Sequence, residues 1–305
     1  MRLAIIGAGA VGAYFGARLA AAGNEVVFVA RGAHLAALQA RGLMVHGARG
    51  KHTVPGSAFV AAGTPIKAVD GVLLCVKLYD LEGAAELARP LVAQGAWCVT
   101  LQNGVDAQHR VGALLGGEHV LGGIAFVSAL IEHPGVVRYT SDMSSMVFGE
   151  LDGRLSDRAL ALQAVCRAAG FDAQACPDIE LRQWTKFVGL ATNAALTSLT
   201  RQNAAYCYHD PVMLPFARAA IAEAEAVGRA AGIALAADIA QHTLGLLQGF
   251  PPGMYASMYH DLVANRRLEL ENLSGHLVRL GAQLGVATPV HGLAYVCLRP
   301  YAAGR

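Results

Sequence analysis

Two patterns of hydrophobic and polar residues divide the chain. Up to about residue 177, short apolar runs with the length of buried strands alternate with helical stretches. The runs predict strands at residues 2–6, 25–29, 43–46, 51–54, 72–76, 97–101, 119–127, 136–140 and 145–149. Helices are expected at residues 11–22, 33–41 and 81–92. This alternation favours a doubly wound parallel sheet, to which the later strands add antiparallel pairs.

From about residue 178 the apolar spacing becomes helical throughout. Asp210 and Pro211 have the pattern of a helix cap and first turn, while Gly232 and Gly285 stand where helices end. In the last expected helix, leucines recur every three or four residues, as in a helix that packs on a core. The predicted helices are residues 178–198, 211–231, 236–249 and 268–284.

The first strand runs directly into a glycine turn, Gly7-Ala8-Gly9-Ala10-Val11-Gly12, and an alanine-rich helix follows. The three glycines permit a tight turn, a close approach of a pyrophosphate to the backbone, and close packing of the helix on the strand. The phosphates would lie at the helix N-terminus, near unpaired N–H groups. We therefore expect a Rossmann-type doubly wound sheet that binds a dinucleotide in residues 1–177, followed by an all-α domain in residues 178–305.

The residue that ends the second strand bears on the choice of dinucleotide. Arg31 occupies this position, next to the expected adenosine ribose, whereas Glu25 lies at the opposite end of the strand. A guanidinium can pair with a 2′-phosphate, so Arg31 predicts NADP rather than NAD. The alternative is that Arg31 is a solvated residue at a strand end.

Composition narrows the classes of function. With 305 residues, 54% hydrophobic and 15% charged, the chain can bury two cores. The net charge is +2 and the basic residues are scattered, which predicts neither nucleic-acid nor membrane binding. The 6 cysteines and 11 histidines lack metal-site spacing. We expect a cytoplasmic protein without a metal that binds a small molecule.

Several polar residues stand where a ligand would need them. Lys77 and Asn103 each follow a predicted strand, and ligands of open α/β sheets bind beyond the carboxyl ends of the strands. Each could also be an ordinary turn residue or a solvated one. Lys186 lies in a mostly apolar helical stretch, so it must reach the surface or be paired in a cleft. Glu269 stands between two leucines, twelve residues after Ser257.

Over almost its whole length the chain resembles the ketopantoate reductase (2-dehydropantoate 2-reductase) family. The resembling segments are the glycine turn, Arg31, Val76-Lys77, Leu101-Gln102-Asn103-Gly104, Phe148-Gly149-Glu150, Trp184-Thr185-Lys186, Ser257-Met258 and Glu269. The resemblance implies NADPH-dependent reduction of a 2-keto acid, with 2-dehydropantoate as the leading substrate, and a place in the synthesis of pantothenate and coenzyme A. A homodimer through the helical domain is a further expectation.

The resemblance also implies individual roles. Lys186 would be the general acid that protonates the developing alkoxide. Asn103 would touch both the substrate and the nicotinamide side, and Lys77 would lie along the cofactor. Ser257 would meet the substrate carboxylate, while Glu269 would bind the cofactor ribose and help to orient Lys186.

The chain departs from the family pattern on the helix of the lysine. The family often carries asparagines four and eight residues after it, and here Leu190 and Ala194 stand at these positions. Asn193, rotated by about 100° from the second position, is the remaining candidate for contact with the substrate. A less polar 2-keto acid is therefore an open alternative.

Helix geometry adds a constraint on Ser257 and Glu269. One straight helix would separate them by about 18 Å, too far for one small substrate site. We therefore expect a break at residues 264–267 and a new helix from near Leu268.

Two other classes remain open. A hydroxyisobutyrate- or phosphogluconate-type dehydrogenase has a similar two-domain plan, but would want an asparagine-rich helix beside the lysine and a longer second domain. A non-catalytic NADP-binding sensor would use its second domain only to dimerise.

Overall fold

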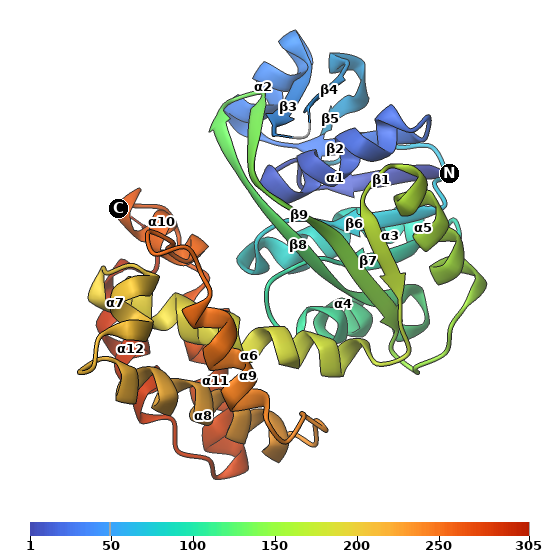
Figure 1. Cartoon of the computed structure of the whole chain (residues 1–305). Coiled ribbons are helices and arrows are strands. Elements are labelled where there is room, and N and C mark those ends of the chain that lie inside the picture. The colour runs from blue at the N-terminus through green and yellow to red at the C-terminus, as the bar shows by residue number, and fades with distance from the viewer. Residues whose placement is uncertain (49, 305) are drawn as a thin grey trace. The chain divides into compact units, whose positions relative to one another are not determined.

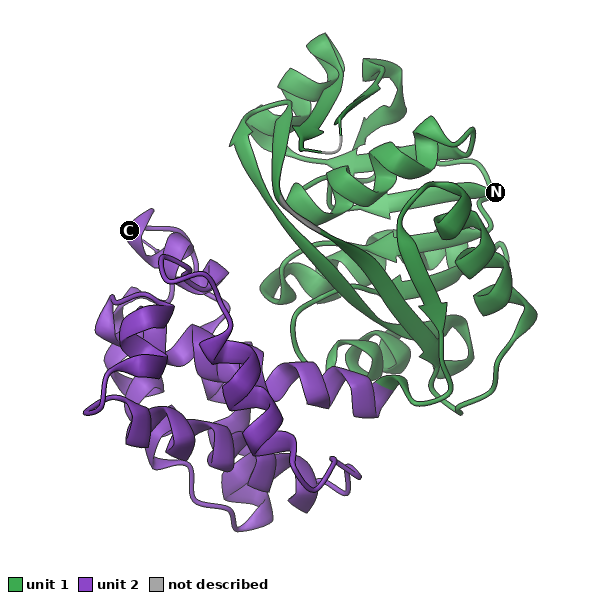
Figure 2. Ribbon diagram, in the orientation of Figure 1, with its two compact units in different colours: residues 1–179 green, residues 180–305 purple. Residues whose placement is uncertain are grey.

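The protein is described by a computed structural model over residues 1–48 and 50–304, apart from the side chains of residues 141 and 142. The chain forms two compact units, residues 1–179 and 180–305 (Figure 2). The division falls two residues beyond the boundary expected from the change in hydrophobic period.

Within the described residues of the first unit, ten strands form one sheet in the order β4-β3-β9-β8-β7-β6-β1-β2-β5, with β10 paired to β9 (Figure 1). The strands are β1 Arg2–Ile6, β2 Glu25–Ala30, β3 Leu43–Gly47, β4 Gly50–Val54, β5 Phe59–Ala61, β6 Gly71–Leu74, β7 Trp97–Thr100, β8 Val120–His133, β9 Val136–Glu150 and β10 Asp172–Ala175. The helices are α1 Ala10–Ala21, α2 Gly32–Arg41, α3 Leu81–Val92, α4 Ala107–Leu115 and α5 Asp157–Ala168. The doubly wound α/β fold class is confirmed.

Alternate residues of β1 belong to different cores, because successive side chains of a strand point to opposite faces. Leu3 and Ile5 pack in the core that includes α1 and α5. Ala4 and Ile6 pack in the core that includes α3 and α4. Helices therefore cover the sheet on both faces, which explains why its central strands are continuous apolar runs.

Strands β8 and β9 form a long antiparallel hairpin (Figure 1). The three strands expected in this region are therefore two, since residues 136–140 and 145–149 both belong to β9. Polar residues interrupt the apolar pattern there, and the pairing shifts its register between Val127 and Ala129, but β9 remains one strand. The Ser128 and Thr140 hydroxyls, for example, form a hydrogen bond of 2.7 Å across the hairpin.

The described part of the second unit is helical, as expected. Its helices are α6 Ile179–Thr200, α7 Ala204–His209, α8 Leu214–Ala230, α9 Ile239–Gln248, α10 Ser257–Val263, α11 Ser274–Leu284 and α12 Pro289–Leu298. The sequence pattern did not predict seven short elements of the two units, namely α4, α5, α7, α10, α12, β5 and β10.

The helix expected from residue 211 begins instead at Leu214. The Asp210 carboxylate accepts hydrogen bonds from the N–H groups of Val212 and Met213 at 2.9 and 3.0 Å. These bonds hold the segment in a turn. The aspartate therefore caps a turn before the helix, and the predicted start at residue 211 was wrong.

The expected break between Ser257 and Glu269 is confirmed. Helix α10 ends at Val263, and Asn265 has a φ of +51°, which interrupts the helix. The helix expected from residue 268 begins only at Ser274, after a 3₁₀ turn.

Candidate active site

The glycine turn has the geometry that a dinucleotide requires. Gly7 adopts a φ of +103°, and its N–H donates to the Val29 carbonyl at 3.1 Å. A Cβ on Gly12 would lie 2.1 Å from the Gly7 carbonyl oxygen, so only glycine fits. The space beside Gly9 is open, and Gly9, as the cap residue of α1, has no side chain that could occupy the helix N-terminus. These features fit a bound pyrophosphate on the first N–H groups of α1.

Arg31 lies at the carboxyl end of β2, where it precedes α2. Its guanidinium, 78% exposed, forms an ion pair with the Asp80 carboxylate. Asp80 belongs to the 3₁₀ turn Leu78–Asp80 after β6. The pair joins the loops that follow the two strands flanking β1.

Lys77 and Asn103 lie in the loops after the neighbouring strands β6 and β7, and both are half-buried. Gln102 connects these loops, because its side-chain amide nitrogen donates to the carbonyls of Leu74 at 2.8 Å and Val76 at 3.0 Å. Gln102 is only 6% exposed. The structure thus brings Lys77 and Asn103 to one edge of the sheet.

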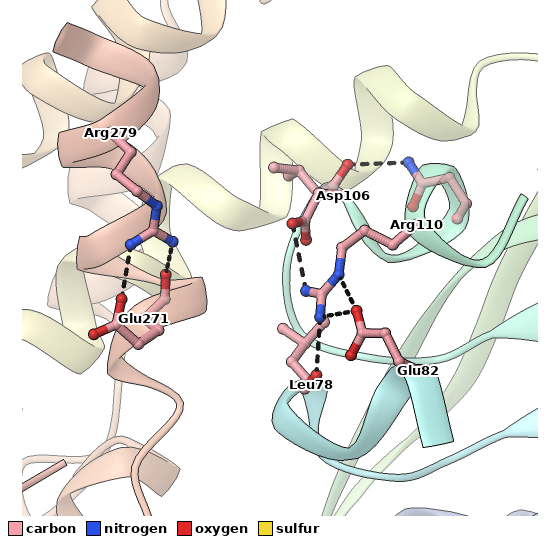
Figure 3. Close-up of polar contacts among 8 residues, drawn as sticks. Leu78, Glu82, Asp106, Arg110, Glu271 and Arg279 are labelled. Atoms are coloured by element: carbon pink, nitrogen blue, oxygen red, sulfur yellow. Dashed lines mark hydrogen bonds and ion pairs between the residues drawn. The ribbon is translucent and has the colours of Figure 1, made fainter. Parts of the chain in front are cut away.

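Arg110 of α4 braces the same edge, a role that sequence reasoning missed (Figure 3). Its guanidinium donates to the Glu82 carboxylate at 2.8 and 2.5 Å, and to the Leu78 carbonyl at 3.3 Å. A longer contact of 3.5 Å reaches Asp106, four residues earlier. The spacing of four residues between Asp106 and Arg110 was the available sequence signal for this role, but pairs with that spacing are common on helices.

Lys186 of α6 and Glu269 interact electrostatically in the second unit. Glu269 is buried, at 4% exposure, and Lys186 is half-buried. Burial lowers the pKa of Lys186 to about 8, while the Glu269 carboxylate acts in the opposite direction. The ammonium is therefore mostly charged at neutral pH, yet it can release its proton readily.

Ser257 is exposed at the start of α10, on the opposite side of the chain break from Glu269. Tyr255 and Tyr259 lie on either side of Ser257 in the sequence, and their rings stack with centroids 4.0 Å apart. Sequence reasoning missed this aromatic pair, because its spacing of four residues also suits an ordinary helix face.

Asn193 has an internal partner. It is 7% exposed, and its side-chain oxygen accepts a hydrogen bond of 2.8 Å from the Tyr208 hydroxyl. Leu190 and Ala194 stand four and eight residues after Lys186, and neither side chain can form a hydrogen bond. A substrate role for Asn193 stays a prediction.

Two features are absent from residues 1–48 and 50–304, and both bear on the class of site. No group of three or more His, Cys, Asp or Glu side chains there could hold a metal ion. No helix in these ranges is long and apolar enough to cross a membrane.

A doubly wound sheet with a glycine turn, followed by a helical unit with a half-buried lysine and a buried carboxylate, is the arrangement expected of a two-domain oxidoreductase that binds a dinucleotide. Comparison with protein families specifies it further. The model described as "Ketopantoate reductase PanE/ApbA" matches residues 3–153, and the model of the C-terminal part of that family matches residues 178–302. The chain belongs to the ketopantoate reductase family, whose activity is that of an oxidoreductase acting on CH–OH groups.

Individual relatives agree with this assignment. The 2-dehydropantoate 2-reductase of Archaeoglobus fulgidus is 32% identical over 290 residues, 95% of this chain and 94% of that protein. The crystal structure of 2-dehydropantoate 2-reductase from Geobacter metallireducens GS-15 has a TM-score of 0.91 at 29% identity, with 98% of this chain and 99% of that chain covered. The ternary structure of D-mandelate dehydrogenase with NADH and anilino(oxo)acetate shares the fold, with a TM-score of 0.89 at 23% identity over 99% and 98% of the two chains.

Proposed function

We propose that this protein uses NADPH to reduce a 2-keto acid to the 2-hydroxy acid, with 2-dehydropantoate as the leading substrate and pantoate as its product. The observation that carries the proposal is the pairing of half-buried Lys186 with buried Glu269 in a chain of the ketopantoate reductase family. A cytoplasmic enzyme of pantothenate and coenzyme A synthesis, dimeric through its helical unit, follows as part of the same proposal.

Lys186 is the general acid of the proposed reaction. When bound, the nicotinamide supplies a hydride to the keto carbon. The Lys186 ammonium donates a hydrogen bond to the carbonyl oxygen, which stabilises the negative charge that develops there, and then transfers its proton to that oxygen. A pKa of about 8 suits this step, because a donor works best when its pKa lies near the working pH.

The first unit would hold the cofactor. The turn from Gly7 to Gly12 would accommodate the pyrophosphate, and Arg31 would pair with the 2′-phosphate, which would favour NADPH over NADH. Lys77 would lie along the cofactor, and Asn103 would contact the nicotinamide side and the substrate. Glu269 of the second unit would contact the ribose, in addition to its effect on Lys186.

Ser257 would bind the substrate carboxylate, and the α6 face next to Lys186 would meet the rest of the substrate. This face supports a second candidate, a 2-keto acid with a branched or aromatic apolar side chain. Leu190 and Ala194 offer no hydrogen bond to a substrate hydroxyl, and the side-chain oxygen of Asn193 is bound to Tyr208. Side-by-side assays of NADPH oxidation with 2-dehydropantoate, 2-oxoisovalerate and phenylglyoxylate distinguish the two candidates.

The Lys186→Ala variant tests the proposed acid. Turnover should fall about 10³-fold while the Kd for NADPH changes by less than about twofold, because general acid catalysis contributes factors of this size and the lysine acts on the substrate. Lys67→Ala, which alters an exposed lysine, is the matched control and should keep full activity. Retention of most activity in Lys186→Ala would refute the assignment and favour a non-catalytic NADP-binding sensor.

A further inference from the structure

We propose that Asp80 sets how strongly the protein discriminates between NADPH and NADH, by lowering the preference for NADPH that Arg31 alone would produce. The inference rests on the proposed function, because it concerns the same dinucleotide site. Asp80 would be a specificity-determining residue that lies outside both the glycine turn and the end of β2.

The sheet topology brings Asp80 to the position of the 2′ substituent. Strand β1 lies between β2 and β6, and Ile6 pairs in parallel register with Val29 and Leu74. The loops after β2 and β6 therefore flank the glycine turn. In folds of this kind the adenosine ribose lies at the end of the second strand, where Arg31 stands. Since Asp80 forms an ion pair with Arg31, its carboxylate lies at the same place.

The two partners differ in how far they can move away from a ligand. The Arg31 side chain is 78% exposed, so its guanidinium can turn towards a phosphate. The Asp80 side chain is 25% exposed, and the Asp80 backbone N–H donates to the Lys77 carbonyl at 2.9 Å within the 3₁₀ turn. The carboxylate therefore remains near the ribose when Arg31 changes its partner.

The chemistry of the two cofactors makes this carboxylate selective. The 2′-phosphate of NADPH is an anion that the Asp80 carboxylate repels, and it must also compete with Asp80 for Arg31. The free 2′-hydroxyl of NADH can donate a hydrogen bond to a carboxylate at this position, as in sites that select NAD. Arg31 and Asp80 thus act in opposite directions, and their balance determines the preference.

The test measures cofactor affinity directly. Titrations of the full chain with NADPH and NADH, followed by nicotinamide fluorescence, give both Kd values for the wild type and for Asp80→Asn. We expect the Kd for NADPH to fall about fivefold and the Kd for NADH to rise about twofold, as for the loss of one exposed charge and one hydrogen bond. Titrations with 2′,5′-ADP and 5′-AMP, which lack the nicotinamide ring, should show the same changes in Kd as NADPH and NADH respectively.

Matched variants separate this effect from a change in folding. Asp80→Ser keeps a small polar residue in the turn and should shift the preference in the same direction. Asp152→Asn removes the carboxylate of another exposed aspartate–arginine pair in the first unit and should leave both Kd values unchanged.

The possible failures can be told apart. If the wild type binds neither cofactor, the proposed function itself is wrong. If it binds a cofactor but Asp80→Asn alters both Kd values by the same factor, or weakens NADPH binding, the inference about Asp80 is overturned while the proposed function stands.

Discussion

At the scale of single residues, the surroundings of Lys186 set its pKa. Burial removes water from the ammonium and lowers its pKa, while the Glu269 carboxylate limits that decrease. A lysine without the carboxylate would lose more of its charge at neutral pH. A fully solvated lysine would hold its proton too firmly to transfer it efficiently.

The first prediction is a pH profile. In the proposed reaction only protonated Lys186 is active, so kcat/KM for reduction should be constant below pH 7 and fall above a pKa of about 8. Glu269→Gln removes the charge that raises this pKa, so the decline should start about one pH unit lower. Glu271→Gln is the control, because that exposed carboxylate pairs with Arg279 (Figure 3). An unchanged profile in Glu269→Gln would contradict the assigned role of the pair.

At the scale of elements, the loops that carry Lys77 and Asn103 owe their positions to residues that do no chemistry. Gln102 connects the loop after β7 to the loop after β6, and Arg110 connects α4 to α3 and to the turn between β6 and α3. A buried amide that donates to two carbonyls and a guanidinium that donates to several acceptors limit how far these loops can move.

The second prediction concerns Arg110 as a positioning residue. Arg110→Ala should raise KM for NADPH about tenfold with a smaller change in kcat, because the loops proposed to contact the cofactor lose the hydrogen bonds that hold them in place. Arg110→Lys keeps one charge and should recover part of the affinity. Arg279→Ala breaks an exposed pair and serves as control. Equal loss of kcat and thermal stability, without a change in KM, would indicate a purely structural role.

The sequence predicts the elements whose apolar patterns are uninterrupted. Strands β1, β2, β6 and β7 are apolar because helices cover both faces of the sheet, so their positions could be predicted closely. The long strand β9 could not, since polar residues break its apolar pattern where the pairing with β8 shifts its register. For the site, the positions of Lys77 and Asn103 could be expected because each residue follows a predicted strand. The contacts of Arg31 with Asp80 and of Gln102 with the loop after β6 could not, because they depend on which strands are neighbours in the sheet.

At the scale of the whole molecule, each unit has a core of its own, and the helical unit contains a pH-sensitive element. His291 is fully buried, and Glu223 accepts the backbone N–H groups of Val290 and His291 at 2.7 and 2.9 Å. Burial lowers the pKa of His291 to about 4. The folded protein therefore keeps His291 neutral until the pH falls to about 4.

The third prediction is a loss of stability in mild acid. The unfolded chain binds a proton on His291 below pH 6.5 but the folded chain does not, so the contribution of this residue is full above pH 6.5 and decreases as the pH falls towards 4. Between pH 7 and 5 the free energy of unfolding should decrease by about 2 kcal/mol from this residue alone. In the His291→Gln variant, this part of the decrease in the free energy of unfolding should be absent.

The chain contains 2 tryptophans, one in each unit, so the unfolding of the helical unit can be followed separately. In a Trp97→Phe background, urea unfolding followed by the fluorescence of Trp184 reports on the helical unit. Burial raises the pKa of Glu223, so this residue makes the folded state more stable as the pH falls, opposite to the effect of His291. The free energies of unfolding of the proteins with and without His291 are therefore compared at each pH. Equal slopes with and without His291 would contradict the prediction.

The break that precedes Glu269 also has a consequence for the order in which the protein matures during synthesis. The N–H of Leu268 donates to the Ala302 carbonyl at 2.9 Å, and Gly304 lies against the backbone of residues 265–267. A nascent chain can form the first unit around its own cores while the ribosome is still translating the second. The segment next to Glu269 gains this support only after residue 302 has left the ribosome, so the proposed proton donor Lys186 acquires its final environment well after the first unit can fold.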